Sequence, residues 1–207
     1  MKPAPGTAAR VHLALLASFL LVLLWSGIRP RDPFIWFLEV LPAIVAAITL
    51  VAVYPRFRLT MLLYCLIWLH AAVLLVGGHW TYAEMPLFSW LRDEFGLARN
   101  YYDRVGHFMQ GFVPAIVARE ILLRNRVISG RGWLFFLVCC IALAVSASYE
   151  FIEWWIAVWS GTAAEAFLAT QGDVWDTQWD MFLALCGAVT SQLLLARWHE
   201  RQLTLLA

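Results

Sequence analysis

The apolar run VHLALLASFLLVLLWSGI, Val11 to Ile28, contains no charged residue. A helix needs about 20 mostly apolar residues to cross the roughly 30 Å of hydrocarbon in a bilayer, and this run approaches that length. A cleaved signal peptide would have a shorter apolar run of about 7–15 residues, followed by a cleavage site of small residues. No such site follows Ile28. The stretch therefore predicts an uncleaved membrane-spanning helix.

Five further windows repeat this pattern, at 34–54, 59–78, 102–123, 133–159 and 178–197, after the first at 11–28. The 207 residues are 62% hydrophobic and 14% charged, whereas soluble domains have about 25% charged residues. The net charge of +1 argues against a nucleic-acid partner, because neutralising phosphates needs a strongly basic face. We expect an all-α polytopic membrane protein, surrounded by membrane lipids, in which residues 1–207 form one bundle of about six transmembrane helices.

The distribution of Lys and Arg predicts how this bundle is oriented. Six spans place both termini on the same side of the membrane. Ten of the 15 basic residues fall on that side and five on the other, and the cytoplasmic side of a membrane protein carries the excess. Both termini are therefore expected in the cytoplasm. The ten residues are Lys2, Arg10, Arg56, Arg58, Arg119, Arg124, Arg126, Arg131, Arg197 and Arg201.

The segment 79–101 is too polar to cross the membrane. Leu87, Leu91 and Phe95 recur within it at helical spacing, with charged residues between them. Such a pattern favours a short helix lying on the outer interface, at about 86–97. This segment is either a lid over whatever the spans enclose or an ordinary loop.

Four ionisable residues from four different spans fall at one depth near the outer surface. At a rise of 1.5 Å per residue, Glu39 lies roughly 5–9 Å deep, His107 roughly 9 Å, Glu150 roughly 5 Å and Asp180 about 10 Å. An ionised group at the bilayer centre costs about 2.5–3.5 kcal/mol, and a shallower one costs less. We therefore expect these side chains to face a shared polar interior.

Neighbouring acids extend this group. In DRVGH, Asp103 lies four residues before His107, so both share one helix face. In SYEFIEWW, Glu153 lies about one turn after Glu150. Both glutamates therefore lie on a similar face of the helix expected in the fifth window.

The stretch GDVWDTQWDM, Gly172 to Met181, introduces the last window with three aspartates. An aspartate at a helix start can accept a first-turn N–H, which explains Asp173 as a cap. Asp176 can likewise be explained by the positive end of the helix dipole, which favours an acid in the first turn. We assign it to both this helix-start role and the polar site. Asp180 is too far into the helix for either role and is assigned to the site.

Carboxylates with one imidazole and no thiolate suit Mg²⁺, Mn²⁺, Ca²⁺ or Zn²⁺. The predicted ligands are His107, Glu150, Asp176 and Asp180. Asp103 or Glu153 would orient the histidine or serve as general base. The four cysteines form no metal-binding spacing, and no nucleotide-binding loop or catalytic serine motif is present. No cofactor other than a metal is expected, and the sequence does not specify an oligomeric state.

Two other classes of function stay open. A small proton- or cation-coupled transporter could use Glu39, Glu150 and Asp180 as a relay. Alternatively, the acid cluster is purely structural, and the protein is not an enzyme. The sequence does not decide between an enzyme, a transporter and a structural role.

The motifs YYDRVGHFMQGF, SYEFIEWW and GDVWDTQWDMFLALCGA resemble those of the YjdF-type bacterial inner-membrane proteins, from about residue 30 to 197. This resemblance implies a multi-pass protein of the bacterial inner membrane. It does not imply a biochemical activity.

A more remote resemblance is to the VanZ-like membrane family, with its pattern D-x-x-x-H, E-x-x-Q and D-x-x-x-N before G-A. That family is associated with glycopeptide resistance at the cell envelope. The resemblance implies an envelope context but no reaction. With the predicted metal site, it leads us to the hypothesis of a metal-dependent membrane enzyme acting on an envelope lipid or lipid-linked intermediate. Here a glutamate replaces the glutamine and an aspartate the asparagine, and both changes make the site more acidic. The matching positions are Asp103, His107, Glu150, Glu153, Asp176, Asp180, Gly187 and Ala188.

Overall fold

The computed structural model describes residues 5–160 and 168–206. Lys2, which contributed to the predicted orientation, and residues 161–167 of the last outer loop lie outside this part of the chain. The described residues form helices and no strand. The helices are α1 (Pro5–Ser26), α2 (Pro33–Val53), α3 (Met61–Trp80), the 3₁₀ turn η1 (Tyr82–Glu84), α4 (Pro86–Phe95), α5 (Tyr102–Arg124), α6 (Arg131–Ser160) and α8 (Asp176–Leu206).

Each of the six predicted windows lies largely on one of the six long helices. Local sequence signals explain where some of them begin and end. At the start of α2, one Asp32 carboxylate oxygen accepts hydrogen bonds from the Phe34 and Ile35 amides, at 2.8 and 3.0 Å. Pro33 follows it at the first helical position, where its missing N–H costs nothing. The amphipathic α4 ends at Gly96, whose left-handed φ of 61° favours glycine.

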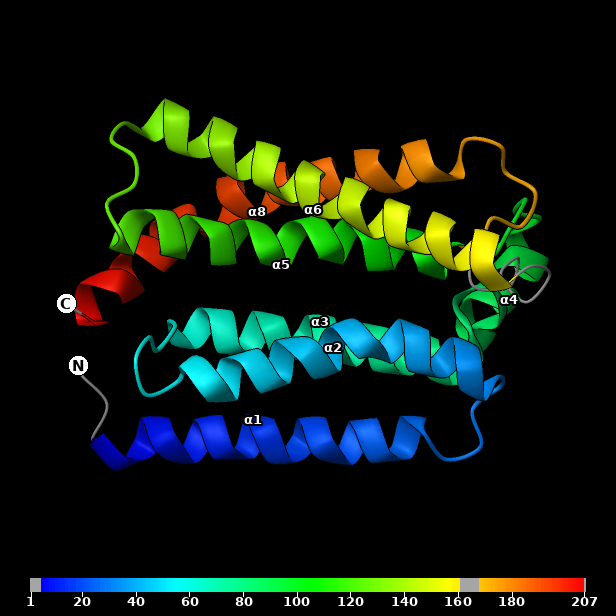
Figure 1. Cartoon of the computed structure of the whole chain (residues 1–207), viewed down its shortest axis with the longest axis horizontal. Helices are drawn as coiled ribbons and strands as arrows, with labels where there is room; N and C mark the ends of the chain where they lie inside the picture. Colours follow the sequence, from blue (N-terminus) through cyan, green and yellow to red (C-terminus); the bar gives the residue numbers. More distant parts are fainter. Residues whose placement is uncertain (1–4, 161–167, 207) are drawn as a thin grey trace.

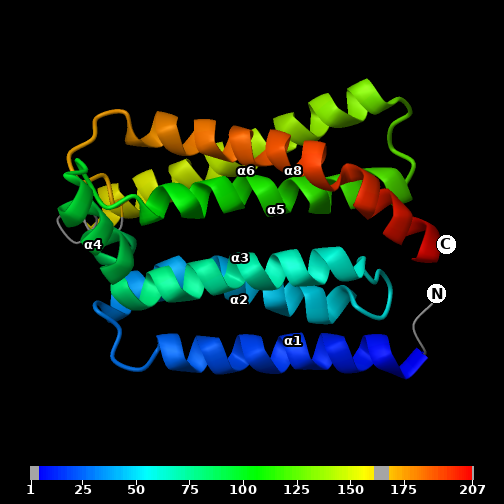
Figure 2. The ribbon, with the colours of Figure 1, turned by 180° about the vertical axis from the view of Figure 1, so that it is seen from behind.

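The long helices form two layers (Figures 1 and 2). One layer contains α1, α2 and α3, and the other contains α5, α6 and α8. Contact between the layers runs mainly through α3 and α5, while α5 and α8 share the most extensive contact of any pair. The two chain ends lie at the same end of the bundle (Figure 1). This agrees with six spans and both termini on one side of the membrane, and the assignment of that side to the cytoplasm stays a prediction.

Two glycines allow the close approach of α5 and α8. A Cβ at Gly111 would overlap the backbone of Ala184, and a Cβ at Gly187 would overlap the backbone carbonyl of Phe108. Small residues are typical of helix contacts within membranes, because they let two backbones approach. His107 lies one turn from Gly111 and Asp180 two turns from Gly187, both toward the outer end. The crossing therefore fixes how these two side chains face each other.

Five of the helices are long and apolar enough to cross a membrane: α1 from Thr7, α2, α3, α6 and α8. The remaining long helix, α5, has 23 residues but a lower hydrophobicity, because it carries several charged side chains. These side chains are buried within the bundle, against the neighbouring helices, so lipid does not meet them. The buried charged residues of α5 are Asp103, Arg104, His107, Arg119 and Glu120.

Helix α4 lies across the outer end of the bundle, opposite the termini (Figure 1). None of its residues is buried, and its apolar side chains Leu87, Trp90 and Phe95 are exposed. The Asn100 amide holds it in place by donating to the Met85 carbonyl and the Ser89 hydroxyl, both at 3.0 Å. A surface helix of this kind is typical of the membrane interface.

Candidate functional site

The acids predicted at the outer surface meet at the outer ends of α5, α6 and α8. His107 lies among them: its Nε2 is 3.4 Å from Asp103 Oδ1 and 3.7 Å from Asp180 Oδ1. Its Nδ1 is 3.7 Å from Glu150 Oε1 and 3.2 Å from the Gln110 side-chain oxygen. All four ionisable side chains are buried. We call Asp103, His107, Glu150 and Asp180 the outer cluster.

Three members of the outer cluster have the geometry of a metal site. Asp103, His107 and Asp180 each offer a ligand atom, and these atoms lie within 4.8 Å of one another. Asp103 Oδ2 and Glu150 Oε1 are buried without a hydrogen-bond partner. Arg99 and Arg104 lie 3.6 and 3.9 Å from Asp103 Oδ2, which is longer than a hydrogen bond. Buried carboxylate oxygens normally have hydrogen-bond partners, so both oxygens could still accept a ligand.

Asp176, which we predicted as a metal ligand, lies farther out and is paired with arginines. One of its oxygens accepts from Arg99 and, at 2.7 Å, from Arg104. Arg104 also pairs with Asp180 and with Asp173, the latter at 3.1 Å. Asp176 is therefore not among the three grouped ligands, and its role as a ligand stays a prediction.

The two arginines were not assigned to these aspartates from the sequence. Neither Glu150 nor Glu153 forms an ion pair with an arginine in the part of the chain that the structure describes. Arg99 instead donates to the backbone carbonyls of Ala169 and Thr170, at 2.8 and 3.1 Å. This connects the start of α5 to the loop before α8. The loop contacts could not be read from helical periodicity.

The buried charges at this end do not balance. Two buried arginines, Arg99 and Arg104, face five buried carboxyl groups. Burying ionised groups without compensation is costly, and a proton on the histidine removes only part of the excess. The arrangement therefore favours an additional cation or protonation of the acids. The five acids are Asp103, Glu150, Glu153, Asp176 and Asp180.

Glu153 and Glu39 lie apart from the three grouped ligands. Glu153 is buried about one turn farther out on α6 than Glu150. Glu39 belongs to the other helix layer, where its Oε1 is 3.5 Å from the Tyr82 backbone amide. Its other oxygen is buried without a partner. The depth predicted for Glu39 from its position in the span is the same as that of the cluster. Depth alone does not predict which helix layer contains the residue.

A cavity of about 740 Å³ lies between the two helix layers and reaches His107. Most of its lining is apolar and comes from α2, α3, α5 and α6. Near the outer end it also contacts Tyr82, Gln110 and Tyr149, while His70 lies farther along. His107 is thus the member of the outer cluster that lines this apolar space.

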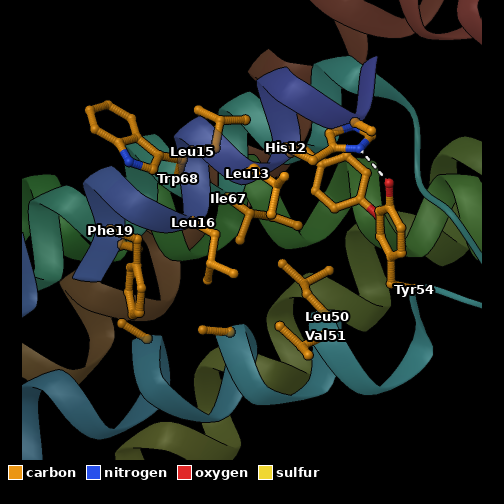
Figure 3. A pocket seen from close by; sticks show the side chains of 15 residues that line it. His12, Leu13, Leu15, Leu16, Phe19, Leu50, Val51, Tyr54, Ile67 and Trp68 are labelled. Carbon is orange, nitrogen blue, oxygen red and sulfur yellow. Dashed lines mark hydrogen bonds between the residues drawn. The ribbon is translucent and has the colours of Figure 1, made fainter. Parts of the chain in front are cut away.

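A smaller cavity of about 380 Å³ lies between α1, α2 and α3 (Figure 3). His12 and Tyr54 meet at its edge, with His12 Nδ1 2.9 Å from the tyrosine hydroxyl. None of the acids of the outer cluster lines it. Its lining residues include no carboxylate or cysteine that could bind a metal together with His12.

A second cluster of buried polar side chains, which we did not predict from the sequence, lies at the opposite end of α5 and α8. Glu120 and His199 are fully buried, with 3.0 Å between Glu120 Oε2 and His199 Nε2. Arg119 donates to His199 Nδ1 at 3.0 Å. Thr60 and Arg124 also donate to Glu120. We call Arg119, Glu120, Arg124 and His199 the inner cluster.

Comparison with known proteins places the chain in a family. A family described as "Predicted membrane protein (DUF2238)" matches residues 11–201. The Escherichia coli (strain K12) protein named "Inner membrane protein YjdF" is 54% identical over 183 residues, covering 88% of each chain. No solved structure matches. The expected likeness to YjdF-type proteins is confirmed, whereas that to the VanZ-like family stays a prediction. The chain belongs to the DUF2238 family of membrane proteins and is a multi-pass protein of the inner membrane.

Proposed function

We propose that the outer cluster binds one divalent metal ion. Asp103, His107 and Asp180 would be its ligands, with Glu150 completing the set. The observation that carries this proposal is the grouping of three buried ligand atoms within 4.8 Å. The Asp103 and Glu150 oxygens that accept no hydrogen bond support it. Their contacts with Arg99, Arg104 and His107 are at 3.6 to 3.9 Å, beyond hydrogen-bond distance.

The ligand set favours some metals over others. One imidazole with two or three carboxylates suits Mn²⁺ or Zn²⁺, and an oxygen-rich set also admits Mg²⁺. A bound metal with an open coordination position polarises a phosphoryl or carbonyl oxygen, or activates a water molecule. Glu153, buried near Glu150, is then the candidate general base.

The surroundings of the site favour a membrane lipid or a lipid-linked intermediate of the envelope as substrate. The outer cluster borders the large apolar cavity instead of a water-filled cleft. A soluble polar substrate would gain little from such a lining, whereas a lipid would bury its apolar part there. We therefore propose a metal-dependent enzyme acting on the head group of such a lipid.

A transporter is less well supported by the structure. Below His107, the cavity is lined mainly by apolar side chains, and His70 is the principal polar group there. A proton or cation crossing the membrane needs a chain of polar groups to the cytoplasm. The described residues do not provide such a chain between the outer and inner clusters.

The test is the metal content of the purified protein. After dialysis against a chelator and reloading with Mn²⁺ or Zn²⁺, the wild type should retain about one equivalent. His107→Ala and Asp180→Asn should lose it, while Asp173→Asn, outside the proposed ligand set, should retain it. Absence of bound metal from the folded wild type would refute the proposal. Retention by His107→Ala would place the metal elsewhere.

A further inference from the structure

The large cavity ends at the outer cluster and runs along α5 from His107 to Val117. At 1.5 Å per residue, these ten residues span about 15 Å. The hydrocarbon of a bilayer is about 30 Å thick and consists of two layers of lipid tails, so one tail spans about 15 Å. The cavity is thus about as deep as one lipid tail is long.

The cavity is open toward the surrounding lipid. Helices α2 and α6 form facing walls but make no extensive contact with each other in the described part of the chain. On the α6 wall, Ile141, Val145 and Ile152 have exposed fractions of 36, 42 and 45%. These are side chains that a tail could reach from the bilayer, between α2 and α6.

The end of the cavity near the outer cluster has polar groups for a lipid head. The Tyr82 hydroxyl is buried without a hydrogen-bond partner, and Tyr82 lines the cavity. This residue has a total exposed fraction of 8%. An O–H group in such a place is satisfied if an oxygen of a bound ligand accepts from it. His107 and Gln110 also line the cavity beside it.

We propose that this cavity binds a phosphate-bearing membrane lipid, which enters sideways between α2 and α6. One tail occupies the apolar cavity, and the phosphate lies at the outer cluster. There the Tyr82 hydroxyl donates to an oxygen of the head group. The position of the phosphate rests on the metal site proposed above, whereas the position of the tail does not. The smaller cavity beside α1 contacts no member of the outer cluster.

The experiment uses a phosphatidylglycerol with a light-activated diazirine on one tail, incorporated with the full-length protein into lipid nanodiscs. The labelled residues are mapped by mass spectrometry. Ala144, on the exposed α6 wall of the cavity, is replaced by Phe to fill the space. Leu143→Phe is the matched control, because Leu143 is the adjacent residue and is also exposed but does not line the cavity.

We expect labels on cavity residues in the wild type and in Leu143→Phe, and their loss in Ala144→Phe. Ala46→Phe, on the α2 wall, tests the same point if Ala144→Phe does not fold. Equal labelling of the cavity in a folded filled variant and in the control would overturn the tail site. The metal content of each variant is measured in parallel.

A diacylglycerol with the same diazirine tail tests the head group. It should label the cavity less than the phosphatidylglycerol does, and Tyr82→Phe should reduce that difference. Equal labelling by the two probes would overturn phosphate recognition. If the variants retain the metal but Ala144→Phe labels the cavity as the wild type does, the lipid inference is contradicted and the metal proposal is not. Cavity labelling by a wild type that binds no metal contradicts the metal proposal alone.

Discussion

The outer and inner clusters lie at opposite ends of α5 and α8, with Glu150 of α6 joining the outer one, and each places a histidine beside one or more carboxylates, yet their bonding differs. In the inner cluster, both Glu120 oxygens and both His199 ring nitrogens have partners, at 2.8 to 3.2 Å. His199 Nδ1 accepts from Arg119, so Nε2 carries the proton donated to Glu120. In the outer cluster, His107 lies 3.4 to 3.7 Å from its three carboxylates.

This difference separates a structural network from a binding site. Fully bonded buried polar groups fix one arrangement of the helices, whereas unbonded ones are costly unless a ligand completes them. Asp103 and Glu150 each have one oxygen without a hydrogen-bond partner, whereas both oxygens of Glu120 have partners. We therefore interpret the inner cluster as the anchor of α8 and the outer cluster as incomplete without its ligand.

The largest effect on stability is expected from a substitution at the crossing of α5 and α8, because this crossing positions both clusters. Gly187→Leu would place a side chain against the Phe108 backbone, which cannot move aside as a flexible side chain can. Overpacking typically costs about 1–3 kcal/mol, and more where backbone is in the way. We expect loss of folded protein by size-exclusion chromatography in detergent. Leu193→Phe, on an exposed position of α8, is the control. A folded Gly187→Leu would show that the close crossing is not required.

The next effect is confined to the inner cluster. Glu120→Gln replaces one acceptor oxygen with an NH₂ group, which then faces the Thr60 amide and either the Arg124 or the His199 donor. Charged hydrogen bonds contribute about 1.5–3 kcal/mol each, so a loss of about 3 kcal/mol in unfolding free energy is expected. Denaturant titration in detergent measures it. Metal content should be unchanged in any folded fraction, and a neutral effect on stability would contradict the anchoring role.

The hydrophobicity of the sequence predicts the spans, and the position of a residue within a span predicts its depth in the membrane. The six spans followed from apolar length, but α8 continues to Leu206, beyond the predicted end at 197. Hydrophobicity marks where the membrane ends, whereas the helix continues because its last turns pack on the inner cluster. The same depth argument placed His107 and Asp180 at one level, and the structure brings them together.

Other features of the two clusters could not be obtained this way. The pairing of Arg99 and Arg104 with the aspartates depends on a loop, whose path has no sequence period. Glu120 and His199 are separated by 79 residues and lie at the inner boundary, where charged residues are ordinary. Only the packing of α5 on α8 shows that they meet.

Adding metal should affect stability through the outer cluster alone. A ligand at 100 times its dissociation constant stabilises the folded state by about 2.7 kcal/mol. We expect Mn²⁺ to raise the thermal unfolding midpoint of the wild type in detergent and of Glu120→Gln by similar amounts. His107→Ala should show no such rise. An equal rise in His107→Ala would mean that the ion acts at another place.

The smallest expected effect is a gain in unfolding free energy, opposite in sign to the loss expected in the inner cluster. Glu150→Gln keeps the side-chain shape but removes one negative charge from the group of buried carboxylates, whose charges repel one another. Without metal, the variant should be more stable than the wild type by about 0.5–2 kcal/mol. It should also bind metal more weakly. Destabilisation of the metal-free protein, as at Glu120, would make Glu150 a structural residue as well.

The most direct test of the metal site is the electron spin echo of Mn²⁺ bound to the wild-type protein. The account predicts modulation from the ¹⁴N nucleus of one directly bound imidazole, and its disappearance in His107→Gln. His70→Gln, on the cavity wall but outside the outer cluster, should leave the signal unchanged. Bound Mn²⁺ without nitrogen modulation, or modulation that survives His107→Gln, would contradict a metal site at Asp103, His107 and Asp180.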